Sequence, residues 1–387
     1  MLELFWLLLP VAAWSGWYIG RRDSGRRNRQ QAHLSRDYFR GLNYIISEQP
    51  DKAIEVFTRM VEVDSETVET HLALGNLFRR RGEVDRAIRI HQNLIARPSL
   101  SSDLRAQALL ELGVDYMRAG LLDRAESLFE QVVEFGVHVE AALRQLLVIY
   151  QQEKEWQKAI DAATRLESRS GAAMQSVVAH FHCELADKAI AQGDRSRTKQ
   201  LLRRALSNDP NCVRASILTG RLEAGQQNYR GALKAYQRVK HQDIDYLPEV
   251  LAPIRDCYHQ LGQTPNMVRY LKDLLDEYPG PAPMLMLADL LQEQQGEREA
   301  IEFVATEVRR RPTVLGLHRL IELTAAGADT KESAGRQILE DAFAEVLRDR
   351  PGYECKQCGF TAKSLYWQCP SCKSWSTVKP THALKGD

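Results

Sequence analysis

Apolar residues recur through residues 37–312 at the spacing of amphipathic helices. A longer pattern repeats on top of this spacing. It consists of a small residue, an aromatic residue three positions later, an alanine nine positions after that, and a bulky residue four beyond. Gly41, Tyr44, Ala53 and Phe57 form the first copy. Further copies, the later ones weaker, occupy residues 75–91, 113–129, 150–159 and 220–236. The pattern predicts pairs of helices that pack against each other.

The repeat has a nearly constant period. The positions equivalent to the alanine are separated by 34, 38, 34, 39, 34, 35 and 33 residues; they are Ala53, Ala87, Ala125, Ala159, Thr198, Ala232, Met267 and Ala300. A period near 34 with this residue pattern is typical of tetratricopeptide repeats, and a simple helical bundle has no reason to keep it. We therefore expect an all-α solenoid of about eight repeats over residues 37–312.

The ends of the predicted helices have their own signals. Pro210, Pro279 and Pro312 are expected to close second helices of the later repeats, and the longer spacings predict longer turns, as at residues 98–103. Residues 313–350 are helical in pattern without the repeat signature. We expect them to cap the array.

The chain opens with an apolar segment. Residues 1–20 contain one charged side chain, Glu3, and are just long enough to cross a bilayer as a helix. The arginines follow this segment, whereas a cleaved signal peptide has basic residues before its apolar stretch. Because basic residues stay on the cytoplasmic side, we predict a single-pass anchor with a basic juxtamembrane linker at residues 21–36 and the bulk of the chain in the cytoplasm.

The distribution of charge along the chain indicates which class of molecule it binds. The formal net charge is +1, and seven arginines fall within residues 21–40. The remainder of the chain is close to neutral. A nucleic-acid-binding protein needs a broad basic surface, so we do not expect nucleic acid as the main partner.

The last segment, residues 351–387, carries the strongest chemical signal. Two C-x-x-C pairs, Cys355 with Cys358 and Cys369 with Cys372, are separated by ten residues. Four thiolates at this spacing can hold one metal ion tetrahedrally, and the ion can be iron or zinc. Gly359 and Pro370 suit the tight turns. The expected small core around the site is Tyr353, Phe360, Tyr366, Trp367 and Trp375.

Other candidate residues have simpler interpretations. The chain lacks the common nucleotide-binding, nucleophile-elbow and zinc-protease motifs, and a metal site closed by four protein ligands leaves no position for a substrate. We therefore do not expect an enzyme. His180 and His182 fall within a helix and are interpreted as ordinary helix residues. The remaining cysteines, at 183, 212 and 257, are expected to pack as small apolar residues.

A repeat solenoid presents a groove that holds peptides or protein surfaces. In the second repeat, Asn76 and Arg79 lie at the register of the inner face and are candidates for gripping a partner. A solvated helix surface is the competing interpretation for both residues.

Three segments together resemble one family. They are the opening MLELFWLLLPVAAWSGWYIGRR, the repeat segment LGNLFRRRGEVDRAIRIHQNL and the ending ECKQCGFTAKSLYWQCPSCKSWSTVKP. The chain is similar in these to the lipopolysaccharide assembly protein B family of Gram-negative bacteria, whose members join an inner-membrane anchor to cytoplasmic tetratricopeptide repeats and a rubredoxin-like metal domain. The family's ligands correspond to Cys355, Cys358, Cys369 and Cys372.

The resemblance implies a regulatory role. It implies a non-enzymatic adaptor that promotes degradation of the deacetylase committing carbon to lipid A. The protease implied is the inner-membrane ATP-dependent AAA metalloprotease, and other lipopolysaccharide biosynthesis or transport proteins are further possible partners. Two alternatives stay open: a scaffold for lipopolysaccharide assembly enzymes, and an electron-transfer protein using an iron-loaded site.

Overall fold

The computed structural model describes residues 14, 38–47, 49–63, 68–98, 100–325, 342, 343, 345 and 351–381. The predicted anchor lies outside this part of the chain except for Trp14, and the predicted linker at residues 21–36 lies wholly outside it. Among the described residues, no helix has both the length and the apolar character needed to span a bilayer. The prediction of an anchor therefore concerns residues that the structure does not describe.

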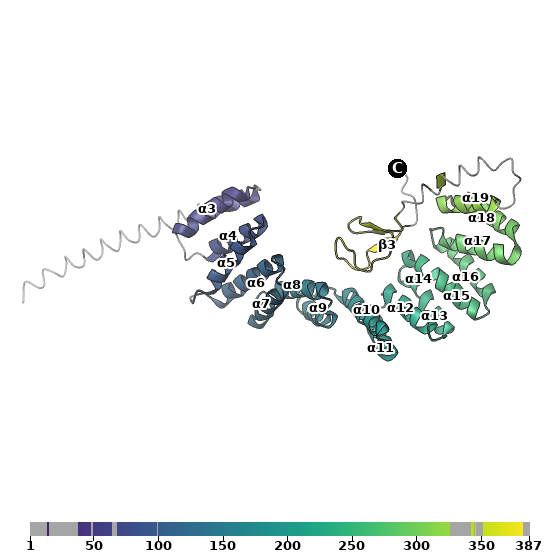
Figure 1. The fold of residues 1–387 in the computed structure, drawn as a ribbon, viewed down its shortest axis with the longest axis horizontal. Coiled ribbons are helices and arrows are strands. Elements are labelled where there is room, and N and C mark those ends of the chain that lie inside the picture. Colours follow the sequence, from purple (N-terminus) through teal and green to yellow (C-terminus); the bar gives the residue numbers. More distant parts are fainter. Residues whose placement is uncertain are drawn as a thin grey trace, which may run out of the picture. The chain divides into compact units, whose positions relative to one another are not determined.

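The chain divides into two compact units, at Gly171 and Ala172 (Figure 1). In the first unit, residues 38–46 form a helical segment. Seven labelled helices follow: α3 (Pro50–Val63), α4 (Val68–Arg81), α5 (Val84–Ile95), α6 (Ser102–Arg118), α7 (Leu122–Phe135), α8 (Val139–Gln152) and α9 (Trp156–Ser170).

The second unit contains further helices and a small sheet. Its helices are α10 (Gln175–Ala191), α11 (Arg195–Asn208), α12 (Val213–Ala224), α13 (Tyr229–Gln237), α14 (Val239–Gln242), η1 (Ile244–Tyr246), α15 (Pro248–Gln260), α16 (Thr264–Glu277), α17 (Ala282–Gln295), α18 (Glu297–Arg310) and α19 (Val314–Ala325). Its strands are β1 (Tyr353–Cys355), β2 (Thr361–Ala362) and β3 (Val378–Pro380).

The predicted repeat pattern corresponds to helix pairs. At all eight positions equivalent to the alanine, the side chain is at most 1% exposed. The small and bulky positions of a repeat also touch. A Cβ atom added to Gly113 would lie 2.6 Å from the ring of Phe129. Gly41 meets Phe57, Gly75 meets His91 and Gly220 meets Tyr236 in the same way. The small residue is thus required because the bulky side chain of the second helix rests on the first helix.

Helix ends follow the sequence signals. Helix α11 ends two residues before Pro210, and α16 and α18 end two residues before Pro279 and Pro312. Helix α5 ends at Ile95 and α6 begins at Ser102, so the connection is long, as the spacing predicts. Of the predicted cap at residues 313–350, α19 is described and packs against α18. Residues 326–341, 344 and 346–350 lie outside the described part.

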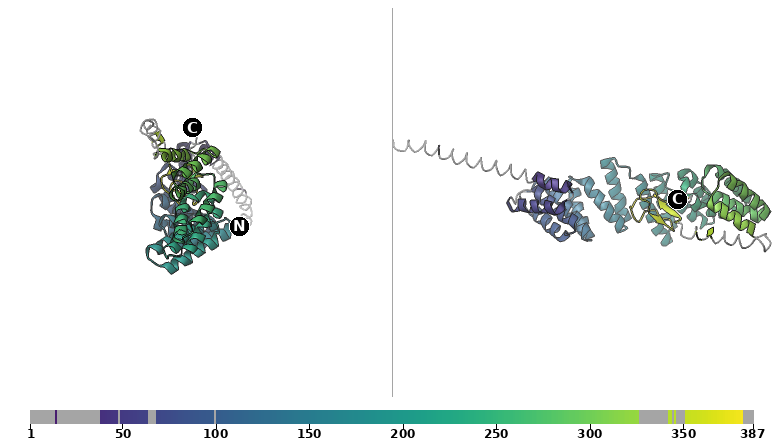
Figure 2. Two further views of the ribbon diagram at one scale, coloured as in Figure 1. Left: turned by 90° about the vertical axis from the view of Figure 1, so that its right-hand side faces the viewer. Right: turned by 90° about the horizontal axis from the view of Figure 1, so that it is seen from above.

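One connection in the second unit departs from the regular repeat. Between α13 and α15 the chain forms the short helices α14 and η1 before the next repeat begins. Tyr246, at the end of η1, is 1% exposed and belongs to an apolar core cluster of the unit. Strand β3 of the C-terminal segment contacts η1 of this connection, and the strands lie near α14 in Figure 1 and toward the middle of the ribbon in the right-hand view of Figure 2.

Candidate metal centre

The C-terminal module, residues 351–381, is built on a small antiparallel sheet. Strand β1 lies between β2 and β3, with Tyr353 opposite Ala362 on one side and Cys355 opposite Val378 on the other. Cys355, Cys369 and Val378 form its buried core, and Tyr353 and Phe360 pack against them. The sheet therefore holds the first cysteine pair against the segment that follows the second.

The two cysteine pairs have equivalent turns. The amide of Gly359 donates to the carbonyl of Cys355, and the amide of Lys373 donates to the carbonyl of Cys369, both at 2.9 Å. Gly359 and Lys373 both have a left-handed backbone, with φ of 75° and 61°. Pro370 lies within the second turn, between Cys369 and Lys373, as expected. Lys373 holds the position equivalent to Gly359, although a residue with Cβ is disfavoured there.

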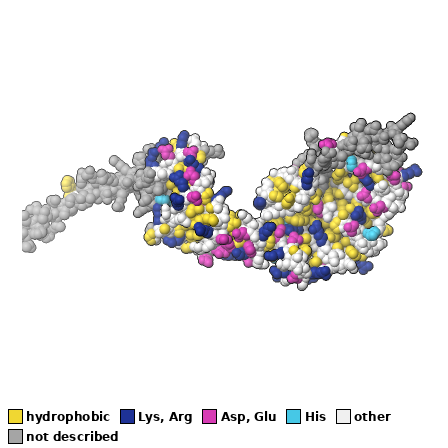
Figure 3. All heavy atoms as spheres, viewed as in Figure 1, with side chains coloured by type: hydrophobic (Ala, Val, Ile, Leu, Met, Phe, Trp, Pro, Cys, Tyr) yellow, Lys and Arg dark blue, Asp and Glu magenta, His cyan; other side chains and the backbone are white. Residues whose placement is uncertain are grey.

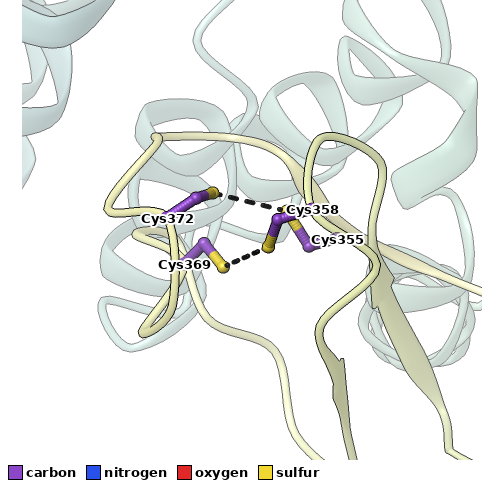
Figure 4. A group of neighbouring side chains, drawn as sticks. All are labelled: Cys355, Cys358, Cys369 and Cys372. Atoms are coloured by element: carbon purple, nitrogen blue, oxygen red, sulfur yellow. Dashed lines mark hydrogen bonds between the residues drawn. The ribbon is translucent and has the colours of Figure 1, made fainter. Parts of the chain in front are cut away.

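The four cysteine sulfurs form one cluster (Figure 4). All four lie within 4.8 Å of one another. The Sγ atoms of Cys355 and Cys372 are 3.8 Å apart, and those of Cys358 and Cys369 are 3.7 Å apart. A tetrahedron with metal–sulfur bonds of about 2.3 Å has sulfur–sulfur edges of about 3.8 Å. A disulfide bond would be about 2.05 Å. The cluster thus fits a tetrathiolate metal ion and not a pair of disulfides.

Local hydrogen bonds favour ionisation of two of the thiols, Cys355 and Cys372. Burial opposes ionisation of Cys355, but hydrogen bonding with the Thr377 side chain and with the backbone of Cys358 and Gln357 outweighs it and lowers its pKa to about 6. Backbone and side-chain hydrogen bonds from Ser374 lower the pKa of Cys372, whereas burial raises that of Cys369 to about 11. A metal ion must displace the remaining protons, so binding depends on pH.

The four ligands differ in their exposure to solvent. Cys355 and Cys369 are buried, Cys372 is half-buried and Cys358 is exposed. A bound ion would be shielded by the sheet on one side and close to solvent at Cys358. The thiolates would supply charge and tetrahedral geometry, which suits iron and zinc alike.

The module docks on the repeats of the second unit through its tryptophans. Trp375 stacks on His180 of α10 at 4.9 Å between ring centroids, and Trp367 stacks on Tyr246 at 5.4 Å. Both had been predicted to belong to the module's own core, and this was wrong for Trp367 and Trp375. The core has room for few side chains, so the indole rings bury their apolar surface against the helices instead.

Polar contacts accompany these stacked rings. The Tyr246 hydroxyl lies 3.1 Å from the carbonyl oxygens of both Ser376 and Val378. Nε2 of His180 lies 2.7 Å from the Ser376 hydroxyl. Burial, with help from the nearby Arg214, lowers the pKa of His180 to about 3, so its ring is neutral at pH 7. Because its Nδ1 has no hydrogen-bond partner within the described residues, we assign the proton to Nε2.

Charged side chains complete the interface. The Lys379 ammonium lies 2.8 Å from Asp243 and 2.9 Å from Asp245. The Tyr353 hydroxyl donates to Glu249 of α15 at 2.7 Å. These acceptors come from the irregular connection and the start of α15. The α14–η1 segment and the start of α15 therefore form part of the surface on which the module docks.

Asn76 and Arg79, the groove candidates, lie together on α4. The Arg79 guanidinium contacts Asn76 at 2.7 Å, Glu111 at 2.6 Å and Asp115 at 2.8 Å. Asp115 is fully buried and also contacts His91, whose Nδ1 is 2.5 Å away. The Arg79 side chain is 15% exposed, so the solvated interpretation was wrong for it. Its guanidinium joins neighbouring repeats, and a role in gripping a partner stays a prediction.

The three cysteines outside the module are buried, as expected. Cys183 and Cys212 lie close together, with Sγ atoms 3.9 Å apart, at the junction of α10 and α12. Both belong to an apolar core cluster. Burial of Cys257 raises the pKa of its own thiol, which is therefore neutral.

A cleft in the first unit was not indicated by the sequence pattern. It has a volume of about 450 Å³ and lies among α7, α8 and α9, with Leu143, Leu146 and Tyr150 in its lining. Acidic side chains gather over these helices (Figure 3). Glu126 contacts Lys158 at 2.8 Å, and the Tyr150 hydroxyl contacts Glu130 at 3.3 Å. Three helices contribute to this surface, so no single segment reveals it.

Comparison with known proteins accounts for both parts of the chain. Residues 353–380 match the family described as "Rubredoxin metal binding domain", and residues 70–101 and 183–246 match "Tetratricopeptide repeat". A protein of Escherichia coli (strain K12) named "Lipopolysaccharide assembly protein B" is 44% identical over 390 residues, with all of both chains covered. The chain belongs to the lipopolysaccharide assembly protein B family. A family member from Haemophilus influenzae is 36% identical, with 98% of each chain covered.

Solved repeat proteins are more distant from this family member. One is the structure titled "Crystal structure of YrrB: a TPR protein with an unusual peptide-binding site", which is 18% identical, with a TM-score of 0.34. The matched region covers 50% of the present chain and 95% of the chain in that structure.

Proposed function

We propose that this chain is a membrane-anchored, non-enzymatic adaptor that regulates lipopolysaccharide synthesis. It promotes degradation of the lipid A-committing deacetylase by the inner-membrane ATP-dependent AAA metalloprotease. The observation that carries the proposal is similarity over the full length of both chains to a protein named for lipopolysaccharide assembly. The naming supports a role in that process, and the specific client and protease come from the resemblance of the sequence to the family.

The architecture suits an adaptor. Repeat helices present extended surfaces for proteins, and a closed tetrathiolate site offers no position for a substrate. An anchor at residues 1–20 would place the chain on the same surface as a membrane protease. Confinement raises the effective concentration of adaptor and protease for each other without a new contact. The repeats or the metal module then recruit the soluble deacetylase.

The direct test is the half-life of the deacetylase in cells. It should lengthen several-fold when the adaptor is absent and return to normal when the full chain is restored. A chain of residues 21–387 should fold yet fail to shorten the half-life. The same chain behind an unrelated membrane helix is the matched control and should restore degradation. Full activity of the truncated chain without any anchor would refute tethering.

Affinity capture from membranes would identify the partners. The full chain should retain the protease and the deacetylase. The variant Cys355→Ser, captured in parallel, would report whether an intact metal module is needed to hold either one. Capture of neither protein by the wild-type chain would contradict the adaptor proposal.

A scaffold is the second candidate, favoured by the word "assembly" in the relatives' name. A scaffold would bring assembly enzymes together with no effect on proteolysis. Unchanged deacetylase half-life combined with loss of assembled lipopolysaccharide would favour it over the adaptor.

Electron transfer is the third candidate, and the exposed position of Cys358 is the observation that favours it. An iron-loaded site near the surface could exchange an electron with a partner. This function would be lost on replacing iron with zinc. An adaptor whose module has a structural role would keep its activity with either ion.

A further inference from the structure

The residues that attach the module to the repeats directly flank its metal ligands. Trp367 lies two positions before Cys369, and Trp375 lies three positions after Cys372. Ser376 and Lys379 follow within the next four positions. Their partners on the repeats are His180, Tyr246, Asp243 and Asp245. The docking groups are thus held in place by the turns that would wrap the ion.

The module has little else to keep it folded. Its buried core consists of Cys355, Cys369 and Val378, and two of these three residues are metal ligands. The described strands are two or three residues long. A core of this size cannot offset the conformational entropy of ordering residues 351–381. Binding of a metal ion to such a site supplies much of the free energy that folds it.

The module covers a surface of the repeats that contains buried aromatic side chains. The Tyr246 ring is 1% exposed with the module in place, and its hydroxyl lies near two main-chain carbonyls of the module. His180 is 1% exposed and is covered by Trp375. Without the module, His180 and Tyr246 would lose the indole rings that stack on them, and Asp243, Asp245 and Glu249 would lose their contacts with Lys379 and Tyr353.

We propose that the metal ion gates this surface: the module covers the repeats of the second unit when the ion is bound and releases them when it is lost. Binding or loss of the ion at the cysteine cluster thereby changes the exposure of helices more than a hundred residues away in the sequence. This inference rests on the fit of the cluster to a metal ion and does not depend on the proposed role in proteolysis.

Hydrogen–deuterium exchange of the full chain tests the proposal, with zinc as the probe ion. In the zinc-loaded protein, amides of residues 353–380 and 239–251 should both be protected. Removal of zinc with a chelator should speed exchange at least tenfold in both segments, and added zinc should restore protection. Helices α17 and α18, in the same unit, should not change.

Two variants separate docking from folding of the module. Cys358→Ser removes an exposed ligand and should behave in zinc as the stripped wild-type protein does. Ser371→Ala, at a neighbouring exposed position, is the control and should behave as loaded wild type. Tyr246→Phe removes one hydroxyl from the receptor side. It should keep zinc and the protection of residues 353–380 while exchange at residues 239–251 quickens.

Three outcomes would overturn the proposal. Protection of residues 239–251 that persists in the stripped protein would mean that the module stays docked without metal. Loss of protection through α17 and α18 as well would mean that the unit simply unfolds. Failure of Tyr246→Phe to change exchange at residues 239–251 would mean that the interface does not determine that protection.

Discussion

His180 and Ser376, 196 positions apart in the sequence, are joined by a hydrogen bond of 2.7 Å between Nε2 and the serine hydroxyl. The imidazole belongs to a repeat helix, and the serine belongs to the metal module. The same ring carries Trp375 on its face. One neutral histidine therefore links the two chemically distinct parts of the second unit.

The buried histidine should make the second unit sensitive to acid. The pKa of His180 is lowered to about 3 by burial and by Arg214, against about 6.5 in the unfolded chain. The unfolded chain binds the proton first as pH falls, so the stabilising effect is complete above about pH 6.5 and is lost between that pH and about 3. The expected slope is about 1.4 kcal/mol per pH unit within that window.

The measurement is urea unfolding of the full chain at pH 7.5 and pH 5.5, beside His180→Asn. The nearby His182, whose pKa is also lowered by burial, and the metal-binding thiols titrate in both proteins. Only the difference between the two proteins in the slope of unfolding free energy against pH measures the contribution of His180. Equal slopes for the two proteins would contradict the assignment.

Glycine at the crossing of two helices should resist substitution. A Cβ atom at Gly220 would collide with the ring of Tyr236, which is 2% exposed. We expect Gly220→Ala to lower the free energy of unfolding by about 1 to 3 kcal/mol. Gly225→Ala, just past the end of α12, meets nothing closer than 3.4 Å and should change it by less than about 0.5 kcal/mol. Denaturant titration of both variants tests the difference, which should vanish if the ring can shift.

The equivalent turns of the metal centre should respond oppositely to substitution. Gly359→Ala places a Cβ at φ of 75°, at a cost of about 1 kcal/mol. Lys373→Gly relieves the same conformation at the second turn and should leave the affinity for zinc unchanged or slightly raised. Competition with a chromogenic chelator measures both affinities. A weaker site in Lys373→Gly than in Gly359→Ala would show that the two turns are not equivalent.

Removing one partner from the buried ionic network of the first unit should strongly destabilise the unit. Asp115 is fully buried between Arg79 and His91. Arg79→Met leaves this carboxylate without its cation and should destabilise the unit by about 3 to 5 kcal/mol. Arg59→Met, which breaks an exposed pair with Glu55, should cost less than about 1 kcal/mol. Unfolding followed by far-UV circular dichroism compares the two. Similar values would mean that water reaches Asp115.

Much of this architecture follows from local pattern. The period near 34 residues determines the helix pairs, because each pair must bury the same face against its neighbours. Ala125 and Met267 are both buried, as their shared position in the pattern requires. The spacing of Cys355, Cys358, Cys369 and Cys372 likewise determines a site for one metal ion, since two-residue gaps let each pair reach the same point.

Tertiary structure decided what the pattern leaves open. Trp367 and Trp375 are aromatic residues beside a metal site, and only the position of α10 and η1 decides that they pack outward on the repeats. Arg79 looks like an exposed helix residue until α6 brings Asp115 beside it. In each case the deciding partner is distant in sequence or imposed by the assembled fold, and local periodicity carries no information about such contacts.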